Sequence, residues 1–146
     1  MTNEEFARQC RDFMKLTCDN NIHRLYGLLQ PEFAGCDIDE RSLTVAFPAQ
    51  SWELNAGGAM HGGITVSMID SIMGTINHVL CGVLTPTIQL NVSFLRGGPA
   101  QGRILVKVKT VKLGRSIIYD VGEAWDEAKP GQLIATAEGT FRNFAG

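Results

Sequence analysis

The spacing of hydrophobic residues in the first third of the chain predicts one helix followed by one or two strands. Four hydrophobic residues recur at helical spacing near the N-terminus: Phe6, Cys10, Phe13 and Met14. Thr2 and Glu5 match the capping box that begins many helices, so we expect a helix over residues 3–17. Residues 22–36 are interrupted by Gly, Pro and Gly and predict no clear element. Hydrophobic residues at every second position over residues 41–47 predict a strand.

The middle of the chain predicts a loop and then a long apolar helix. Residues 48–63 contain two glycine pairs and predict the loop. Residues 63–80 have helical length and are apolar on most sides, so we expect this helix to be buried. A single carboxylate, that of Asp70, lies within it, surrounded in the sequence by Met68, Ile69, Ile72 and Met73. Burying a lone acid is unfavourable, which makes Asp70 a candidate functional residue.

From Leu84 onward the spacing of hydrophobic residues changes to two, and this predicts four strands. Hydrophobic residues at 88, 90, 92 and 94 alternate with polar residues at 87, 89, 91 and 93. Three further strands are expected near 102–113, 115–126 and 132–142, separated by glycine-containing turns. The short connections predict a meander in which these four strands are antiparallel neighbours. The expected fold class is α+β, with a curved antiparallel sheet wrapped around a central helix and an additional N-terminal helix.

Composition fits one globular domain and argues against several classes of protein. The chain has 146 residues, of which 45% are hydrophobic and 19% charged, and a net charge of -2. This charge gives no general attraction to nucleic acid or to an anionic membrane. The four cysteines form no CxxC pair and no metal-ligand spacing, so we expect no metal. No signal peptide and no apolar stretch of about 18 residues is evident, which favours a cytoplasmic protein without a membrane partner.

The segment that ends in Asp70 has the features of an acyl-transfer site. Gly62 and Gly63 stand at the start of the predicted central helix, where amides lack internal partners and lie at the positive end of the helix. Because glycine has no Cβ, a ligand can approach these amides closely, and they could stabilise an oxyanion. Asp70 could activate water as a general base or attack directly as a nucleophile.

Helix geometry predicts that such a site needs two subunits. Gly62 and Asp70 are eight residues apart, which is about 12 Å along a helix axis. One subunit cannot easily place both groups around one carbonyl. Two antiparallel helices across a twofold axis would bring Gly62 of one subunit near Asp70 of the other. We therefore expect the site at a dimer interface, with two sites in each dimer.

The pattern Asn55…His61-Gly62-Gly63…Asp70 resembles that of hotdog-fold acyl-CoA thioesterases of the phenylacetyl-CoA thioesterase (PaaI-like) type. The similarity covers about residues 40–142 and continues through these segments: Thr87 to Arg96, Gly102, Gly114-Arg115 and Leu133 to Phe141. It implies a single hotdog domain over residues 1–146, with residues 1–35 as an N-terminal helix and lead-in and residues 40–142 as the core. It also implies a homodimer or a homotetramer.

The resemblance implies a role for each matched residue. Asp70 would be the catalytic carboxylate, and the Gly62 amide would polarise the thioester carbonyl from the facing subunit. Asn55 and His61 would orient the substrate or hold the oxyanion loop. Thr87 matches a hydroxyl that positions the water in some members, a role that the neighbouring Thr85 could also take. The residues expected near the nucleotide or phosphates of coenzyme A are Arg96, Gly114, Arg115 and Ser116. No cofactor is implied, because coenzyme A is part of the substrate.

We therefore expect an acyl-CoA thioesterase that acts on an aryl or a short- to medium-chain acyl group. An acyl-carrier-protein thioester is an alternative substrate, and Asp70 could act as base or as nucleophile. Two other functions remain open. A hotdog hydratase or dehydratase generally pairs a catalytic histidine with an acid in a different local pattern, and a non-catalytic protein would bind acyl-CoA without turnover.

Overall fold

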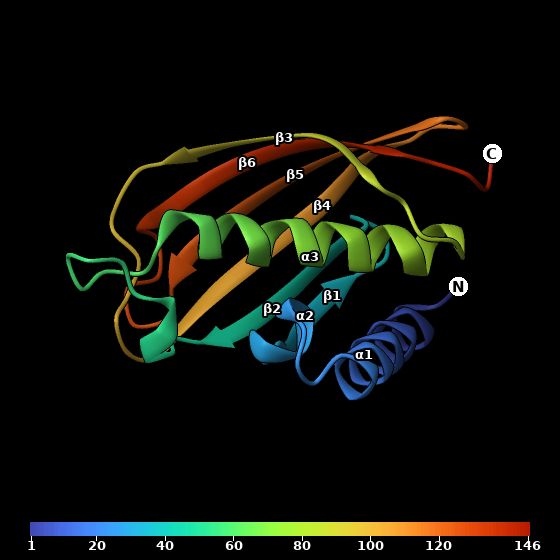
Figure 1. The fold of residues 1–146 in the computed structure, drawn as a ribbon. Coiled ribbons are helices and arrows are strands. Elements are labelled where there is room, and N and C mark those ends of the chain that lie inside the picture. The colour runs from blue at the N-terminus through green and yellow to red at the C-terminus, as the bar shows by residue number, and fades with distance from the viewer.

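The computed structural model describes residues 1–146 and shows a six-stranded antiparallel sheet curved around a central helix (Figure 1). The helices are α1 (Asn3–Asn20), α2 (Leu25–Leu28), the single turn η1 (Ser51–Glu53) and α3 (Gly62–Cys81). The strands are β1 (Glu32–Asp37), β2 (Ser42–Pro48), β3 (Thr87–Phe94), β4 (Arg103–Leu113), β5 (Ile117–Asp126) and β6 (Leu133–Arg142). The sheet order is β1-β2-β4-β5-β6-β3, so β1 and β3 are the two edge strands.

The expected meander of four neighbouring strands is wrong for β3. Strands β4, β5 and β6 do form a meander, but β3 pairs with β6 and has no contact with β4 in the sheet. The connection after Phe94 runs across the end of the sheet, where Gly98 makes an isolated bridge with Met60. Because of this crossing, one side of β3 has no strand neighbour.

Helix α1 begins as the sequence predicts and ends three residues later. The Thr2 hydroxyl accepts a hydrogen bond from the Glu5 amide at 3.1 Å, and the Glu5 carboxylate accepts one from the Thr2 amide at 2.7 Å. The buried face of the helix consists of Phe6, Cys10 and Met14. This face packs against β1 and α3 and closes the lower side of the fold (Figure 1).

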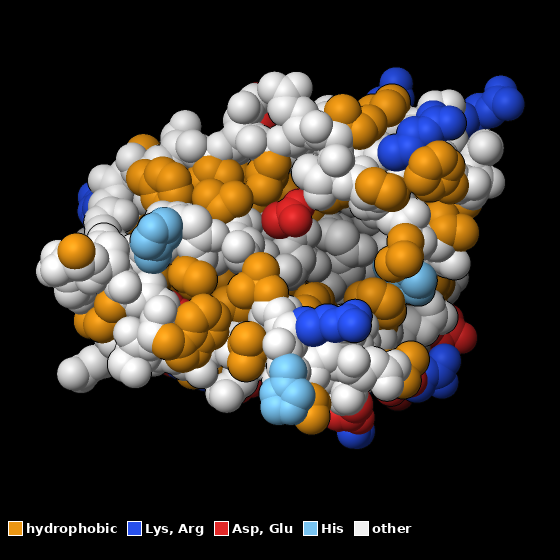
Figure 2. All heavy atoms as spheres, viewed as in Figure 1, with side chains coloured by type: hydrophobic (Ala, Val, Ile, Leu, Met, Phe, Trp, Pro, Cys, Tyr) orange, Lys and Arg blue, Asp and Glu red, His pale blue; other side chains and the backbone are white.

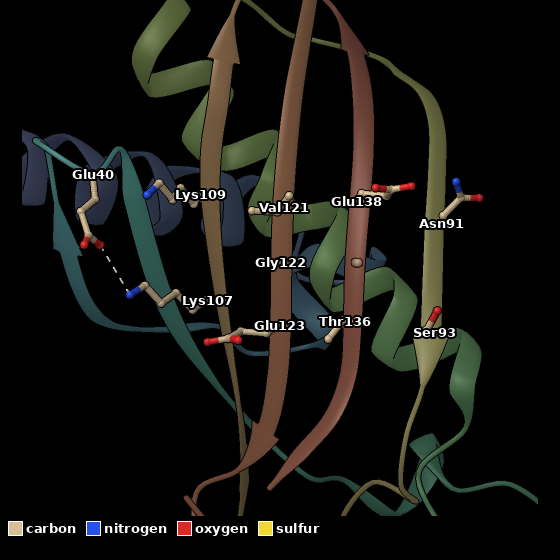
Figure 3. A pocket seen from close by; sticks show the side chains of 11 residues that line it. Glu40, Asn91, Ser93, Lys107, Lys109, Val121, Gly122, Glu123, Thr136 and Glu138 are labelled. Carbon is tan, nitrogen blue, oxygen red and sulfur yellow. Dashed lines mark ion pairs between the residues drawn. The ribbon is translucent and has the colours of Figure 1, made fainter. Parts of the chain in front are cut away.

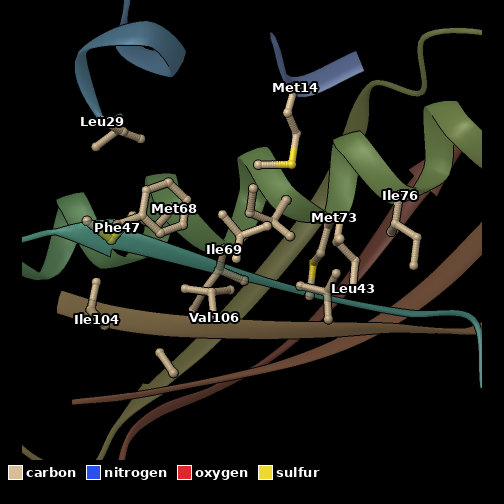
Figure 4. Packing of buried hydrophobic residues seen from close by; sticks show 14 of the residues in the cluster. Met14, Leu29, Leu43, Phe47, Met68, Ile69, Met73, Ile76, Ile104 and Val106 are labelled. Carbon is tan, nitrogen blue, oxygen red and sulfur yellow. The ribbon is translucent and has the colours of Figure 1, made fainter. Parts of the chain in front are cut away.

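The core lies between one side of α3 and the concave face of the sheet (Figure 4). Side chains from α3 pack there on side chains from β2 and β4: Met68, Ile69, Ile72, Met73 and Ile76 on Leu43, Val45, Phe47, Ile104 and Val106. Asp70 does not lie among these residues, because it is only half-buried on another side of the helix. The expectation of a carboxylate buried in this cluster is therefore wrong for the single chain.

Helix α3 is less covered than its composition predicts. By length and apolarity alone it could cross a membrane, contrary to our expectation from the sequence, but 44% of its most apolar window is buried within this fold. Its sheet-facing side forms the core, and its other side stays open. In Figure 2 that open side shows hydrophobic side chains around one acidic group near the centre of the face. Such a half-open apolar surface is typical of a helix that packs against a partner.

Candidate active site

The N-terminal end of α3 presents one amide without an acceptor, that of Gly62. His61 is the N-cap residue, and its Nδ1 accepts a hydrogen bond from the Gly63 amide at 2.9 Å. The carbonyl of His61 accepts hydrogen bonds from Ile64 at 2.9 Å and from Thr65 at 3.3 Å. The Gly62 amide is thereby left as the free donor at the positive end of the helix. This donor can hold a carbonyl oxygen or an oxyanion.

Asn55 holds the loop that leads into α3. Its Oδ1 accepts hydrogen bonds from the amides of Gly57 at 2.9 Å and Ala59 at 3.2 Å. Its backbone amide donates to the Ala59 carbonyl at 2.7 Å. The amide of His61 donates to the carbonyl of Glu53 at 2.8 Å, which ties the loop to η1. Asn55 and His61 therefore shape the loop that aims the Gly62 amide.

Glu53 is a buried acid beneath this loop that the sequence analysis missed. Its Oε1 accepts a hydrogen bond from the Gln50 amide at 2.7 Å, while its Oε2 has no partner. Burial raises the pKa of this carboxyl. No local pattern distinguishes Glu53 from a surface acid, because its burial depends on the packing of η1 against the rest of the chain.

Asp70 and Thr87 meet across the gap between α3 and β3. The Thr87 hydroxyl donates to Asp70 Oδ1 at 2.6 Å. Simple alternation along β3 would have placed Thr87 on the same face as Gln89, away from the helix. The register of β3 on β6 instead shifts between Thr87 and Gln89. This irregularity turns Thr87 toward α3. Thr87 is the only side chain in this chain that hydrogen-bonds to the Asp70 carboxylate.

A cavity of about 410 Å³ lies beside the free amide of Gly62. It brings together three predicted site residues, Asn55, Gly62 and Arg96, and its apolar wall includes Phe94 and Ile134. Asp70 and Thr87 do not line it. A single chain therefore holds the amide donor and the carboxylate in two separate places, as the helix geometry predicts.

The residues expected near coenzyme A lie at two opposite ends of the sheet. Arg96 donates to the carbonyl of Leu133, where β6 begins. Gly114, Arg115 and Ser116 form the turn between β4 and β5, where the side-chain amide of Asn143 donates to Gly114 O just past the end of β6. The ten residues of β6 separate these two ends, a distance of about 30 Å. One chain does not bring the two groups together.

A second depression lies on the opposite face of the sheet from α3 (Figure 3). It has a volume of about 640 Å³ and is lined by polar side chains that include Lys107, Lys109, Glu123 and Glu138. Lys107 also forms an ion pair with Glu40 at 3.6 Å. None of the predicted site residues lies there. No group of three or more His, Cys, Asp or Glu side chains anywhere in the chain is arranged to hold a metal ion.

Comparison with known proteins agrees with this fold. The family model described as the thioesterase superfamily matches residues 57–130. The candidate esterase PA1618 of Pseudomonas aeruginosa is 28% identical over 130 residues, which cover 84% of this chain and 85% of that protein. A candidate thioesterase of Ralstonia eutropha JMP134, a phenylacetic acid degradation-related protein, matches with a TM-score of 0.75 and 25% identity over 89% of this chain and 98% of that one.

A third relative, smu.793 of Streptococcus mutans UA159, was solved with bound acetyl CoA. It matches with a TM-score of 0.70 and 20% identity, over 77% of this chain and 87% of that one, which shows a shared fold. The architecture is thus that of the hotdog thioesterases. This chain belongs to the thioesterase superfamily, and it is a thioester hydrolase.

Proposed function

We propose that this protein is an acyl-CoA thioesterase whose active site is completed by a second copy of the chain. Coenzyme A is the proposed carrier because smu.793, which shares the fold, was solved with acetyl CoA. The observation that carries the proposal is the separation of two functional pairs along β3. Thr87, next to Asp70, stands at the first residue of this strand, and Phe94, next to Gly62, stands at the last.

Antiparallel pairing of two β3 edges would join these pairs. An exposed edge strand offers unpaired backbone groups to another strand. If two copies of β3 paired about a twofold axis near the middle of the strand, the Thr87 end of one copy would face the Phe94 end of the other. Asp70 of one subunit would then approach the Gly62 amide of the other, and two equivalent sites would result.

The same pairing would bring together the residues proposed to contact coenzyme A. The turn of Gly114, Arg115 and Ser116 lies at the end of the sheet where β3 begins, and Arg96 lies where β3 ends. In a β3-paired dimer, Arg96 of one subunit and Arg115 of the other would flank the same site. Both guanidinium groups lack a carboxylate partner within the chain. They are therefore available to a phosphate.

The proposed reaction is hydrolysis of the thioester by water. Asp70 takes a proton from the water as its oxygen attacks the carbonyl carbon, and the carbonyl oxygen becomes an oxyanion held by the Gly62 amide. Collapse of this intermediate breaks the C–S bond. The leaving thiolate takes up the proton, so that the products are the free acid and coenzyme A. Direct attack by Asp70, with an anhydride intermediate, would use the same contacts.

The test is a thiol-release assay with aryl, short-chain and medium-chain acyl-CoA esters. We expect turnover by the parent protein and a loss of at least about 100-fold in kcat for Asp70→Asn, which keeps the shape of the side chain but cannot act as a base. Asp19→Asn, on the exposed end of α1, is the matched control and should keep parent activity. Acyl-CoA binding without turnover in the parent would instead identify a binding protein.

The proposal extends to assembly and location. We propose a cytoplasmic homodimer, with pairing of two dimers into a homotetramer as the larger assembly. Light scattering on purified protein distinguishes these states by mass. A monomer with full activity would contradict the shared site.

A further inference from the structure

The ring of Phe94 covers the residue that carries the free amide. A Cβ built on Gly62 would lie 3.2 Å from Phe94 Cζ and 3.5 and 3.6 Å from the two Cε atoms. The far edge of the ring therefore rests on Gly62 itself. Phe94 is half exposed in the single chain, and it lines the same cavity as Gly62.

The surroundings of Phe94 form an apolar wall. The ring lines the cavity of about 410 Å³ together with Met60, Leu95 and Ile134. On β3, Leu90 and Val92 share its helix-facing side and are partly covered by the core, whereas Phe94 stands at the end of this row. Its position fixes an apolar surface next to the place where a carbonyl oxygen would bind.

We propose that Phe94 determines acyl specificity by restricting branching at the carbon next to the thioester carbonyl. A carbonyl oxygen bound by Gly62 lies about 3 Å from its nitrogen, and the carbon next to the carbonyl is only two bonds further. Because the ring already contacts Gly62, a second substituent on that carbon would meet the ring. Unbranched acyl groups fit beside the ring, and groups branched at this carbon do not. This inference rests on the proposed thioesterase function.

The direct test compares butyryl-CoA with isobutyryl-CoA, which have the same atoms but differ in branching at this carbon. A single misplaced methyl group typically changes kcat/KM by about 10- to 200-fold. We expect the parent to prefer butyryl-CoA at least about tenfold. Phe94→Ala should reduce this preference to less than about threefold by raising kcat/KM for isobutyryl-CoA. Phe94→Leu, which keeps an apolar side chain at the strand end, should give an intermediate preference.

Phe33→Ala is the matched control. Phe33 is a partly buried phenylalanine on β1, the opposite edge of the sheet, so its loss should leave the preference unchanged. If Phe94→Ala fails to fold or to associate, Phe94→Leu decides the question.

The outcomes separate this inference from the proposed function. If the parent releases thiol from no aryl, short-chain or medium-chain acyl-CoA ester, the thioesterase proposal fails. If the parent hydrolyses both esters equally well, or if both Phe94 variants keep the parent preference, the inference about Phe94 is overturned while the thioesterase function stands.

Discussion

Thr87 and Asp70 are joined by a 2.6 Å hydrogen bond in which the hydroxyl donates to Oδ1 of the carboxylate. The bond connects the first residue of β3 to the middle of α3 and uses only one of the two carboxylate oxygens. Oδ2 is left free to accept a proton from water.

Replacing Thr87 tests this positioning role. We expect Thr87→Val, which keeps the branched shape but loses the hydroxyl, to lower kcat by about 10- to 100-fold, because a hydrogen bond to a charged group contributes about 1.5–3 kcal/mol. KM should change little, since the hydroxyl orients the base and does not hold the substrate. Thr87→Ser, which keeps the donor, should recover most of the activity. Steady-state kinetics on one acyl-CoA ester measures both constants, and equal losses in both variants would contradict the role.

The free amide of Gly62 can be removed with little disturbance of the helix. Proline is well tolerated at the first position of a helix, and His61, with a ψ of 131°, already has a conformation that suits the residue before proline. We expect Gly62→Pro to lower kcat by about 100- to 1,000-fold, as for the loss of an oxyanion donor.

Gly62→Ala is the control for the Gly62→Pro experiment, because it adds a Cβ near Phe94 but keeps the amide. Circular dichroism checks that both variants fold. If Gly62→Ala proved as inactive as Gly62→Pro, the effect would come from crowding and not from the lost donor.

A shared active site predicts that two inactive variants restore each other. In a mixed dimer of Asp70→Asn and Gly62→Pro subunits, one site carries both defects and the other carries neither. Random mixing makes half of the dimers mixed, so about a quarter of the parent activity should return. The measurement is thiol release after the two variants are unfolded and refolded together. Activity that stays at the level of the separate variants would show that each chain holds its own complete site.

The sequence predicts the local elements of this fold better than their long-range pairing. The capping box at Thr2 and Glu5 is a local signal, and the helix begins there. The alternation after Leu84 predicts β3, but it carries no information on which strand lies beside it. The pairing of β3 with β6 joins segments more than 40 residues apart along the chain, and this pairing depends on the packing of the whole sheet around α3.

In the candidate site too, the sequence predicts the local features but not the long-range contact. The type and order of residues from Asn55 to Asp70 indicate an amide donor and a base. The contact of Asp70 with Thr87 depends on a register shift in β3, which alternation alone conceals. The sequence leaves open whether a second strand precedes the central helix, because Pro31 and Gly35 interrupt the pattern around β1. The register of this short edge strand is itself irregular between Phe33 and Gly35.

A second buried acid, Asp120, lies beneath the C-terminal half of α3. It is fully buried, and its Oδ2 accepts a hydrogen bond from the side-chain amide of Asn77 at 2.7 Å. The Thr110 hydroxyl donates to the Asn77 oxygen at 3.3 Å, and Asp120 Oδ1 has no partner. Burial raises the pKa of Asp120 to about 7. The carboxyl is thus favoured in its neutral form within the fold.

This raised pKa predicts that stability decreases as the pH rises from about 4 to about 7. Below pH 4 Asp120 is neutral in both states. As the pH rises, Asp120 loses its proton in the unfolded state first, and this favours unfolding. The effect stops growing once Asp120 also ionises in the folded state, near pH 7. The ionisation of Asp120 lowers the free energy of unfolding by up to about 4 kcal/mol over this pH range. Asp120→Asn should therefore be more stable than the parent at pH 8, with no such advantage at pH 4.

The measurement is the free energy of unfolding by urea at pH 4, 6 and 8 for both proteins. Burial raises the pKa of Glu53 as well, so Glu53 also makes stability decrease as the pH rises. Only the difference in free energy of unfolding between the parent and Asp120→Asn therefore reports the contribution of Asp120. Glu138→Gln, an exposed acid on β6 whose carboxylate accepts from Tyr119 at 2.8 Å, is the control for the loss of one negative charge. A difference between Asp120→Asn and the parent that stays constant from pH 4 to pH 8 would show that folding does not raise the pKa of Asp120.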